Sequence, residues 1–186
     1  VTVTAPDGVS VTYSESENGT YGAENPAYTD AGNYTVYYKA AQIGAEDVTG
    51  SATVTISEKP VTVSGIMAEN KPYDGNAGAT LNYDSVTFSG IVTGDELTVT
   101  ATGTFESAEV GDGKAVRITG LTLGGADAGN YQLAETGQQT ETTANITANA
   151  LNVTATGYSG TYDGQSHSVT VTAPDGVSVT YSESEN

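Results

Sequence analysis

The side chains in this sequence that could do chemistry are a single histidine, 23 carboxylates and five basic residues. Because His167 is the only histidine, a catalytic triad or a histidine metal cluster would depend on it alone. His167 follows the turn Tyr162-Asp163-Gly164 and precedes an alternating stretch, which is an ordinary place for a surface or edge residue. We therefore expect no enzyme and no catalytic residue.

Carboxylates in glycine-rich loops raise the alternative of a calcium site, because Ca²⁺ takes several oxygen ligands. No segment has the dense D-x-D-x-D-G pattern of a dedicated calcium loop. We expect these loops to be solvated and the chain to need no cofactor, with calcium kept as an alternative. The candidate ligands are Asp30, Asp95, Glu96, Asp112 and Asp127.

Lysines raise a third chemistry, the intramolecular isopeptide bond, which needs a buried Lys beside Asn or Asp and a carboxylate to move protons. Lys39 alternates out of phase with Tyr38 and is expected on an outer face, and Lys59 lies in a linker. Lys71 and Lys114 adjoin turns and are the candidate donors. Long lysine side chains usually keep their ammonium in water, so we expect surface lysines, with a crosslink as the alternative.

Tyrosines could bind a ligand, because exposed aromatic rings can stack on sugars. The sequence has 12 Tyr and no Trp. Outward tyrosines also pair commonly across a sheet, so a structural role is preferred and glycan binding is kept as the alternative. The tyrosines concerned are Tyr13, Tyr21, Tyr28, Tyr37 and Tyr38.

The charge is strongly acidic, with 23 Asp and Glu against five Lys and Arg and a net charge of −18. Such a surface repels nucleic acid and anionic membranes, and we expect neither as a partner. No apolar run approaches the roughly 20 residues of a membrane helix, so no membrane insertion is expected within this window. Hydrophobic residues make up 37%, which is enough for small folded cores.

Apolar and polar residues alternate with a period of two through nearly the whole chain, which predicts half-buried strands. No helical period persists, so we expect an all-β protein. The predicted strands include Val1–Thr4, Val9–Tyr13, Tyr34–Tyr38, Ala52–Ile56, Val61–Val63, Leu97–Thr100, Val116–Ile118, Leu121–Leu123 and Leu151–Val153.

The first 18 residues, 1–18, recur without change as 169–186, which gives a period of 168 residues. We interpret the chain as a window from a tandem array, and repeats of this kind usually build length or valency. Residues 1–57 are expected to be the C-terminal part of one domain, with its opening strand missing. Residues 58–147 are expected to be a complete domain, and 148–186 the N-terminal part of the next copy of the first.

A weaker repeat relates the two domains. Tyr73-Asp74-Gly75 recurs as Tyr162-Asp163-Gly164, and the motif Asp-Ala-Gly-Asn-Tyr occurs twice. Its spacing is typical of the tyrosine corner of immunoglobulin-like sandwiches, where the hydroxyl bonds back to nearby upstream backbone. The glycines are expected to allow positive φ. The structural site residues are Asp30, Gly32 and Tyr34 in one copy and Asp127, Gly129 and Tyr131 in the other.

At these motifs the chain resembles known families. The stretch from Val61 through Asn70–Gly75 and Leu121–Tyr131 to Ile146 resembles the YDG repeat domain of large bacterial surface proteins. The split domain, 148–186 with 1–57, is similar to the MBG family found alongside it. The resemblance implies tandem Ig-like β-sandwich domains, arranged end to end in an extracellular, cell-surface adhesin-like protein.

We therefore expect a structural repeat unit that acts as a spacer in a bacterial surface fibre or adhesin stalk. Its partners are expected to be neighbouring repeats, joined end to end through short linkers. At roughly 3.3 Å per strand residue, each domain is expected to be on the order of 35 Å long and each unit about 70 Å. Two alternatives stay open: a glycan- or ligand-binding adhesin module with exposed tyrosines, and a separate subunit that donates a strand to its neighbour.

Overall fold

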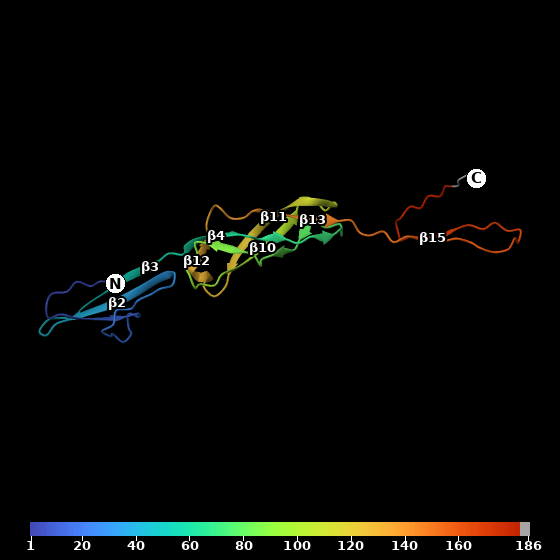
Figure 1. The fold of residues 1–186 in the computed structure, drawn as a ribbon. Coiled ribbons are helices and arrows are strands. Elements are labelled where there is room, and N and C mark those ends of the chain that lie inside the picture. Colours follow the sequence, from blue (N-terminus) through green and yellow to red (C-terminus); the bar gives the residue numbers. More distant parts are fainter. Residues whose placement is uncertain (183–186) are drawn as a thin grey trace.

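The structure, a computed structural model, describes residues 1–182. Three parts follow one another along an elongated molecule: an N-terminal sheet, a central domain and a C-terminal hairpin (Figure 1). In residues 1–182 the only helix is the three-residue 3-10 helix η1 (Ala128–Asn130). No helix in this range is long and apolar enough to cross a membrane.

The N-terminal sheet has three antiparallel strands in the order β1-β2-β3. They are β1 (Ser10–Ser14), β2 (Gly32–Ala41) and β3 (Val48–Ile56). Val36, in the middle of β2, is the one hydrophobic side chain of residues 1–57 that is fully buried. Val54 and Ile56 on β3 are only half-buried. This sheet therefore has an apolar face without a full layer over it.

The central domain runs from Lys59 to Thr147 and contains ten strands and η1. Its strands are β4 (Lys59–Ser64), β5 (Met67–Ala68), β6 (Lys71–Pro72), β7 (Gly78–Ala79), β8 (Leu81–Asn82), β9 (Thr87–Ser89), β10 (Thr98–Phe105), β11 (Gly111–Gly124), β12 (Tyr131–Leu133) and β13 (Glu141–Thr147).

The central strands form a five-stranded sheet in the order β6-β13-β11-β10-β7 and a three-stranded sheet in the order β12-β4-β9. A two-stranded sheet, β5-β8, completes the set. Most neighbours are antiparallel, but β12 runs parallel to β4 and β13 parallel to β6. Strands from near the start of the domain therefore pair with strands near its end, which closes the domain.

Two clusters of buried side chains form the core of the central domain. Leu81 packs against both clusters, so the core is continuous. Each fully buried aliphatic or aromatic side chain stabilises the fold by roughly 1.5–3 kcal/mol. The buried residues are Val63, Ile66, Val99 and Ile118 in one cluster, and Phe105, Val116, Ala144 and Ile146 in the other.

The C-terminal part is an antiparallel hairpin of β14 (Thr154–Thr156) and β15 (Thr170–Thr172). Its large apolar side chains are open to solvent: Leu151 is 62% exposed and Tyr162 is 99% exposed. The last four residues of the repeated 18, 183–186, lie outside the described residues. Unlike the central domain, this part has no buried core among the residues that the structure describes.

The all-β prediction is confirmed, but two predicted strands are absent and two others form one strand. Val1–Thr4 and Leu151–Val153 are not strands, because neither has a neighbouring strand to pair with. Val116–Ile118 and Leu121–Leu123, predicted separately, belong to one long strand, β11. Gly120 lies between them with φ of 64°, near a shift in register against β10, so the strand bends and continues.

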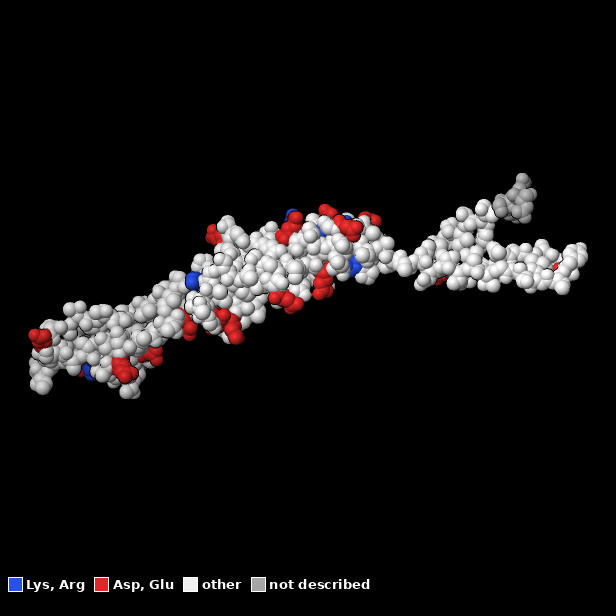
Figure 2. All heavy atoms as spheres, viewed as in Figure 1, with Lys and Arg blue, Asp and Glu red and all other residues white. Residues whose placement is uncertain are grey.

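The carboxylates are scattered along the N-terminal and central parts of the visible face, while the C-terminal part is mostly uncharged there (Figure 2). Residues 148–168 hold one carboxylate, Asp163, and one histidine. Like charges spread along an elongated molecule oppose collapse and association. The acidity is thus a property of the outer surface.

Candidate functional site

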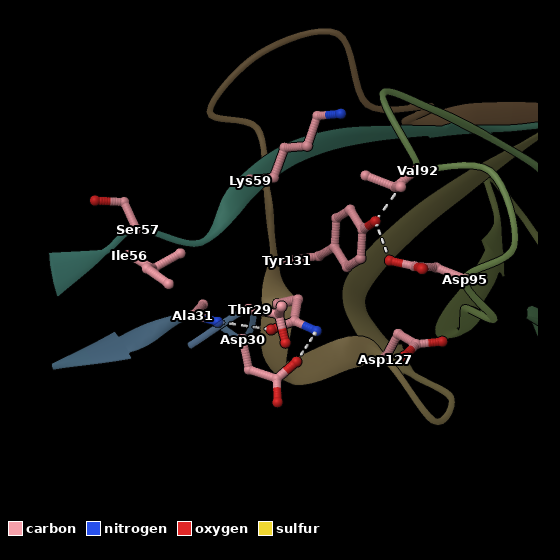
Figure 3. Close-up of a pocket in the computed structure, with 11 residues that line it drawn as sticks. Thr29, Asp30, Ala31, Ile56, Ser57, Lys59, Val92, Asp95, Asp127 and Tyr131 are labelled. Carbon is pink, nitrogen blue, oxygen red and sulfur yellow. Dashed lines mark hydrogen bonds between the residues drawn. The ribbon is translucent and has the colours of Figure 1, made fainter. Parts of the chain in front are cut away.

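The two copies of the Asp-Ala-Gly-Asn-Tyr motif meet at the joint between the N-terminal sheet and the central domain (Figure 3). Asn130 Oδ1 accepts a hydrogen bond from the backbone N–H of Ala31 at 2.7 Å. Asn130 Nδ2 donates to Asp30 Oδ1 at 3.2 Å. One amide side chain thus contacts the other motif through both of its polar atoms.

Each motif is held at the joint by its own domain. Asp30 and Ala31 come directly before β2, and Asn130 ends η1 directly before β12. Asp127 Oδ2 accepts from the N–H of Glu96 at 2.7 Å, which ties the start of the second motif to the strand region before β10. Gly125 has φ of 104°, and a Cβ there would lie 2.4 Å from Glu96 O, so the approach requires glycine.

Tyr131 anchors the second motif inside the central domain. Its ring is 5% exposed, and its hydroxyl accepts from Val92 N–H at 2.9 Å and donates to Asp95 Oδ2 at 2.5 Å. Burial raises the pKa of Tyr131 above its usual value, and the neighbouring Asp95 carboxylate raises it further. These partners are distant in sequence, so Tyr131 does not make the nearby upstream bond predicted for it.

Tyr34 makes the shorter bond of the predicted kind. Its hydroxyl donates to the carbonyl of Asp30, four residues upstream, at 3.0 Å. Its ring stacks on Tyr28, with the ring centroids 3.9 Å apart. Tyr28 is therefore already engaged by a neighbouring ring.

Only one of the two motif glycines, Gly32, has the positive φ that was predicted for both. Gly129 is not among the glycines with positive φ, because it lies inside η1, where the backbone is right-handed. Gly32 has φ of 159°, close to extended backbone, at the first residue of β2. The prediction of a left-handed residue at Gly129 is wrong.

A cavity of about 400 Å³ lies at the joint, and three of the proposed calcium ligands, Asp30, Asp95 and Asp127, line it. The described residues include no group of three or more His, Cys, Asp or Glu side chains arranged to hold a metal ion. The three carboxylates instead accept hydrogen bonds, from Asn130, Tyr131 and Glu96 respectively. Their observed role is to hold the joint and the loops around it.

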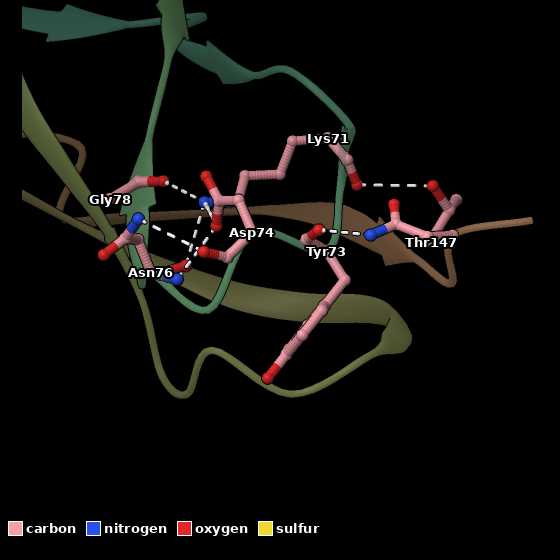
Figure 4. A network of polar contacts seen from close by, with 7 residues as sticks. Lys71, Tyr73, Asp74, Asn76, Gly78 and Thr147 are labelled. Atoms are coloured by element: carbon pink, nitrogen blue, oxygen red, sulfur yellow. Dashed lines mark hydrogen bonds and ion pairs between the residues drawn. The ribbon is translucent and has the colours of Figure 1, made fainter. Parts of the chain in front are cut away.

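The Tyr73-Asp74-Gly75 turn lies at the opposite end of the central domain (Figure 4). Asp74 Oδ1 accepts from Asn76 N–H at 2.9 Å and pairs with Lys71 Nζ at 2.8 Å. Lys71 Nζ also donates to the carbonyls of Asn76 and Gly78. The Lys71 ammonium holds the pKa of Asp74 below its ordinary value, and the backbone bond from Asn76 acts in the same direction.

The second Tyr-Asp-Gly turn has the same local design. Asp163 Oδ1 accepts from Gln165 N–H and lies 2.9 Å from His167 Nε2. The bond from Gln165, and then that from His167, lower the pKa of Asp163. His167 also stacks on Tyr158, with centroids 3.6 Å apart. The only histidine therefore fastens a turn.

Of the lysines expected on the surface, Lys39 is exposed and Lys114 is buried. Lys39 pairs with Asp47 at 2.6 Å on an accessible surface, and this contact raises the pKa of Lys39. Lys114 was expected on the surface, but it is 8% exposed. Its ammonium donates to Ser107 Oγ at 2.7 Å and lies 3.9 Å from Glu106. The prediction failed because the side chain points inward from β11 and reaches polar partners at the rim.

Two glutamines that the sequence analysis did not single out bond the backbone of β4 and of Ile66, just after β4. Gln138 Oε1 accepts from Val63 N–H, and its amide nitrogen donates to Val61 O. Gln139 does the same with the N–H and the carbonyl of Ile66. The side-chain amides thus replace a neighbouring strand. Consecutive glutamines after a strand were the available signal, but their partners lie more than 70 residues away.

Comparison with known proteins identifies the central domain. The family model described as the YDG domain matches residues 57–143. Residues 57–143 form a YDG domain. No curated protein and no solved structure matches the chain.

The matched segment includes the first Tyr-Asp-Gly turn, the Asp127–Tyr131 motif and both glutamines. The joint residues Asp30 and Ala31 lie outside it. The joint is therefore a contact between the YDG domain and a different folded part of the chain.

Proposed function

We propose that this chain is a repeating spacer of an extracellular bacterial fibre or adhesin stalk, without enzymatic activity. The observation that carries the proposal is the joint: Asn130 of the YDG domain binds both Asp30 and Ala31 of the preceding sheet. A spacer must transmit orientation from one domain to the next. Two hydrogen bonds beside the short linker between β3 and β4 restrict bending there.

The domain organisation fits the same role. Tandem Ig-like sandwiches are proposed here, with a YDG domain alternating with a second domain that is similar to the MBG family. Extracellular localisation follows from the resemblance of both segments to surface-protein repeats. Alternation separates each domain from its identical copy, which reduces strand exchange during folding.

The surface supports contacts with neighbouring repeats over contacts with polyanions. The net charge of −18 disfavours nucleic acid and anionic membrane as partners. The joint and the hydrogen-bonded turns of the YDG domain use their polar groups internally. End-to-end contact between repeats is the partner interaction that we propose.

The strands suggest a longer unit than the sequence-based estimate. β11 alone has 14 residues and, at roughly 3.3 Å each, a contour length of about 46 Å, which the bend at Gly120 shortens. Two such domains in line give an axial repeat of about 70–90 Å. Electron microscopy of an array of several 168-residue units tests this: particle length should grow in equal steps of that size.

One observation favours the second candidate, glycan binding. Tyr21 and Tyr37 line a polar groove with Glu17 and Asn18 on the N-terminal sheet. Aromatic rings beside carboxylate and amide groups are chemically suited to a sugar. A glycan array probed with the full chain tests this candidate, with Tyr37→Ala as the matched control; uniform failure to bind would remove it.

A further inference from the structure

The two identical 18-residue copies, 1–18 and 169–186, have different strand pairing. The segment that forms a paired strand in one copy is unpaired in the other. In the C-terminal copy, β15 (Thr170–Thr172) pairs with β14, whereas the same residues of the N-terminal copy, 2–4, form no strand. In the N-terminal copy, β1 (Ser10–Ser14) pairs with β2, whereas 178–182 form no strand. Each copy is paired only on the side where its partner strand is present.

The burial of apolar residues shows the same complementarity. In the YDG domain the opening strand β4 buries Val61 and Val63 to 1% and 0% exposure. The corresponding residues of the C-terminal part, Leu151 and Val153, are 62% and 45% exposed. Opening-strand side chains therefore find a sheet to cover in the YDG domain and find none in the C-terminal part.

The closing strands show the other half of the same arrangement. Ala144 and Ile146 of β13 are 5% and 1% exposed, while Val54 and Ile56 at the end of β3 remain half-buried. In the YDG domain, β6 lies just ahead of the Tyr-Asp-Gly turn and pairs in parallel with the end of β13. The equivalent segment ahead of Tyr162 has no partner strand in residues 1–182.

We infer that the β1-β2-β3 sheet is a docking site for a copy of residues 148–168 placed directly ahead of Val1 in a longer chain. Leu151 and Val153 of that copy cover the apolar face of the sheet. Its Thr154–Thr156 pairs with 2–4 in the register that β14 uses with β15, and the segment ahead of Tyr162 extends along the end of β3. The inference rests on the tandem organisation in the proposed function.

Charge is compatible with this occupant. Residues 148–168 carry one carboxylate, which is paired with His167 within the same turn. A nearly neutral segment docks on the acidic N-terminal part without adding repulsion. The docked product is one complete domain, continuous through the joint with the YDG domain.

The test is an extended chain in which a second copy of 148–168 precedes the full sequence 1–186. Hydrogen exchange of the β3 amides is compared between the extended and the original chain. We expect exchange of the outer-edge β3 amides to slow by about tenfold or more, because these amides gain a partner strand. Unchanged exchange in β3 would overturn the inference.

Two matched variants locate the effect. Leu151→Asp with Val153→Asp in the added copy should abolish the gain, since both side chains would be buried there. The same pair of changes in the original C-terminal copy should leave the gain intact. Equal loss from both variants would contradict the assigned docking site. Because this experiment uses no fibre, its failure is distinguishable from failure of the spacer role, which is measured by particle length.

Discussion

Asn130 and Asp30 belong to two copies of the same five-residue motif, yet they lie in different folded parts and are hydrogen-bonded at 3.2 Å. The second bond of Asn130, to Ala31 N–H, fixes the direction of the amide. The motif of the central domain thus contacts its own counterpart in the preceding sheet. The two copies of the repeated motif together form the joint.

Substitution Asn130→Ala should loosen this joint while leaving the YDG domain folded. Both lost bonds cross the joint and are partly exposed, so the melting temperature of the YDG domain should fall by less than about 5 °C. Residual dipolar couplings should show wider relative motion of the two parts. The matched control is Asn33→Ala, because Asn33 occupies the same motif position but bonds Thr55 within its own sheet. Equal effects of both variants would contradict the joint.

Substitution Tyr131→Phe should destabilise the YDG domain. Val92 N–H loses its acceptor and Asp95 loses a donor in a partly buried place, so we expect the melting temperature to fall by about 5–10 °C. Tyr34→Phe removes a single, exposed hydrogen bond to the carbonyl of Asp30, so the melting temperature should fall by less. Calorimetry of both variants checks the order, and a larger loss in Tyr34→Phe would refute it.

The same tyrosine predicts a loss of stability at alkaline pH. The folded pKa of Tyr131 is raised, so its contribution is complete below the unfolded value near 10 and is lost as pH rises through the folded pKa. Denaturant unfolding from pH 8 to pH 12 should show this decline. In Tyr131→Phe the decline should be shallower, and an unchanged slope would argue against this assignment.

Because the pKa of Asp74 is lowered, this residue should make the domain lose stability at acid pH. Lys71 lowers its folded pKa, so the stabilisation is present above the unfolded value near 3.9 and disappears as pH falls through the folded pKa. Asp74→Asn should flatten the unfolding free energy below about pH 4 relative to the parent chain. The control is Asp84→Asn in the same domain. A steeper acid dependence in Asp74→Asn than in this control would count against the pair.

The side-chain amide of Gln139 bonds the Ile66 backbone as a neighbouring strand would, so its loss should destabilise the domain. Gln139→Ala leaves the N–H and the carbonyl of Ile66 without these partners, which should cost about 1–3 kcal/mol of unfolding free energy. Gln132→Ala is the matched control, because Gln132 makes a single exposed bond to Glu58. Equal costs measured by denaturant unfolding would contradict a special role for Gln139.

The sequence predicted what repeats locally and missed what depends on distant partners. The alternation of apolar and polar residues predicted the all-β class, and the Tyr-Asp-Gly motif indicated the YDG family. The partners of Tyr131 lie more than 35 residues away, and no local pattern encodes them. The same is true of the burial of Lys114, which depends on how β11 lies against neighbouring strands. Val1–Thr4 shows that alternation predicts a face but does not supply the partner strand.

The central claim, that this chain is a semi-rigid spacer, is tested most directly by the length of defined arrays. Arrays of two, four and six 168-residue units would be imaged by electron microscopy and their end-to-end lengths measured. We predict a linear increase of about 70–90 Å per unit. Lengths that grow only as the square root of the number of units, as for freely jointed domains, would contradict the account.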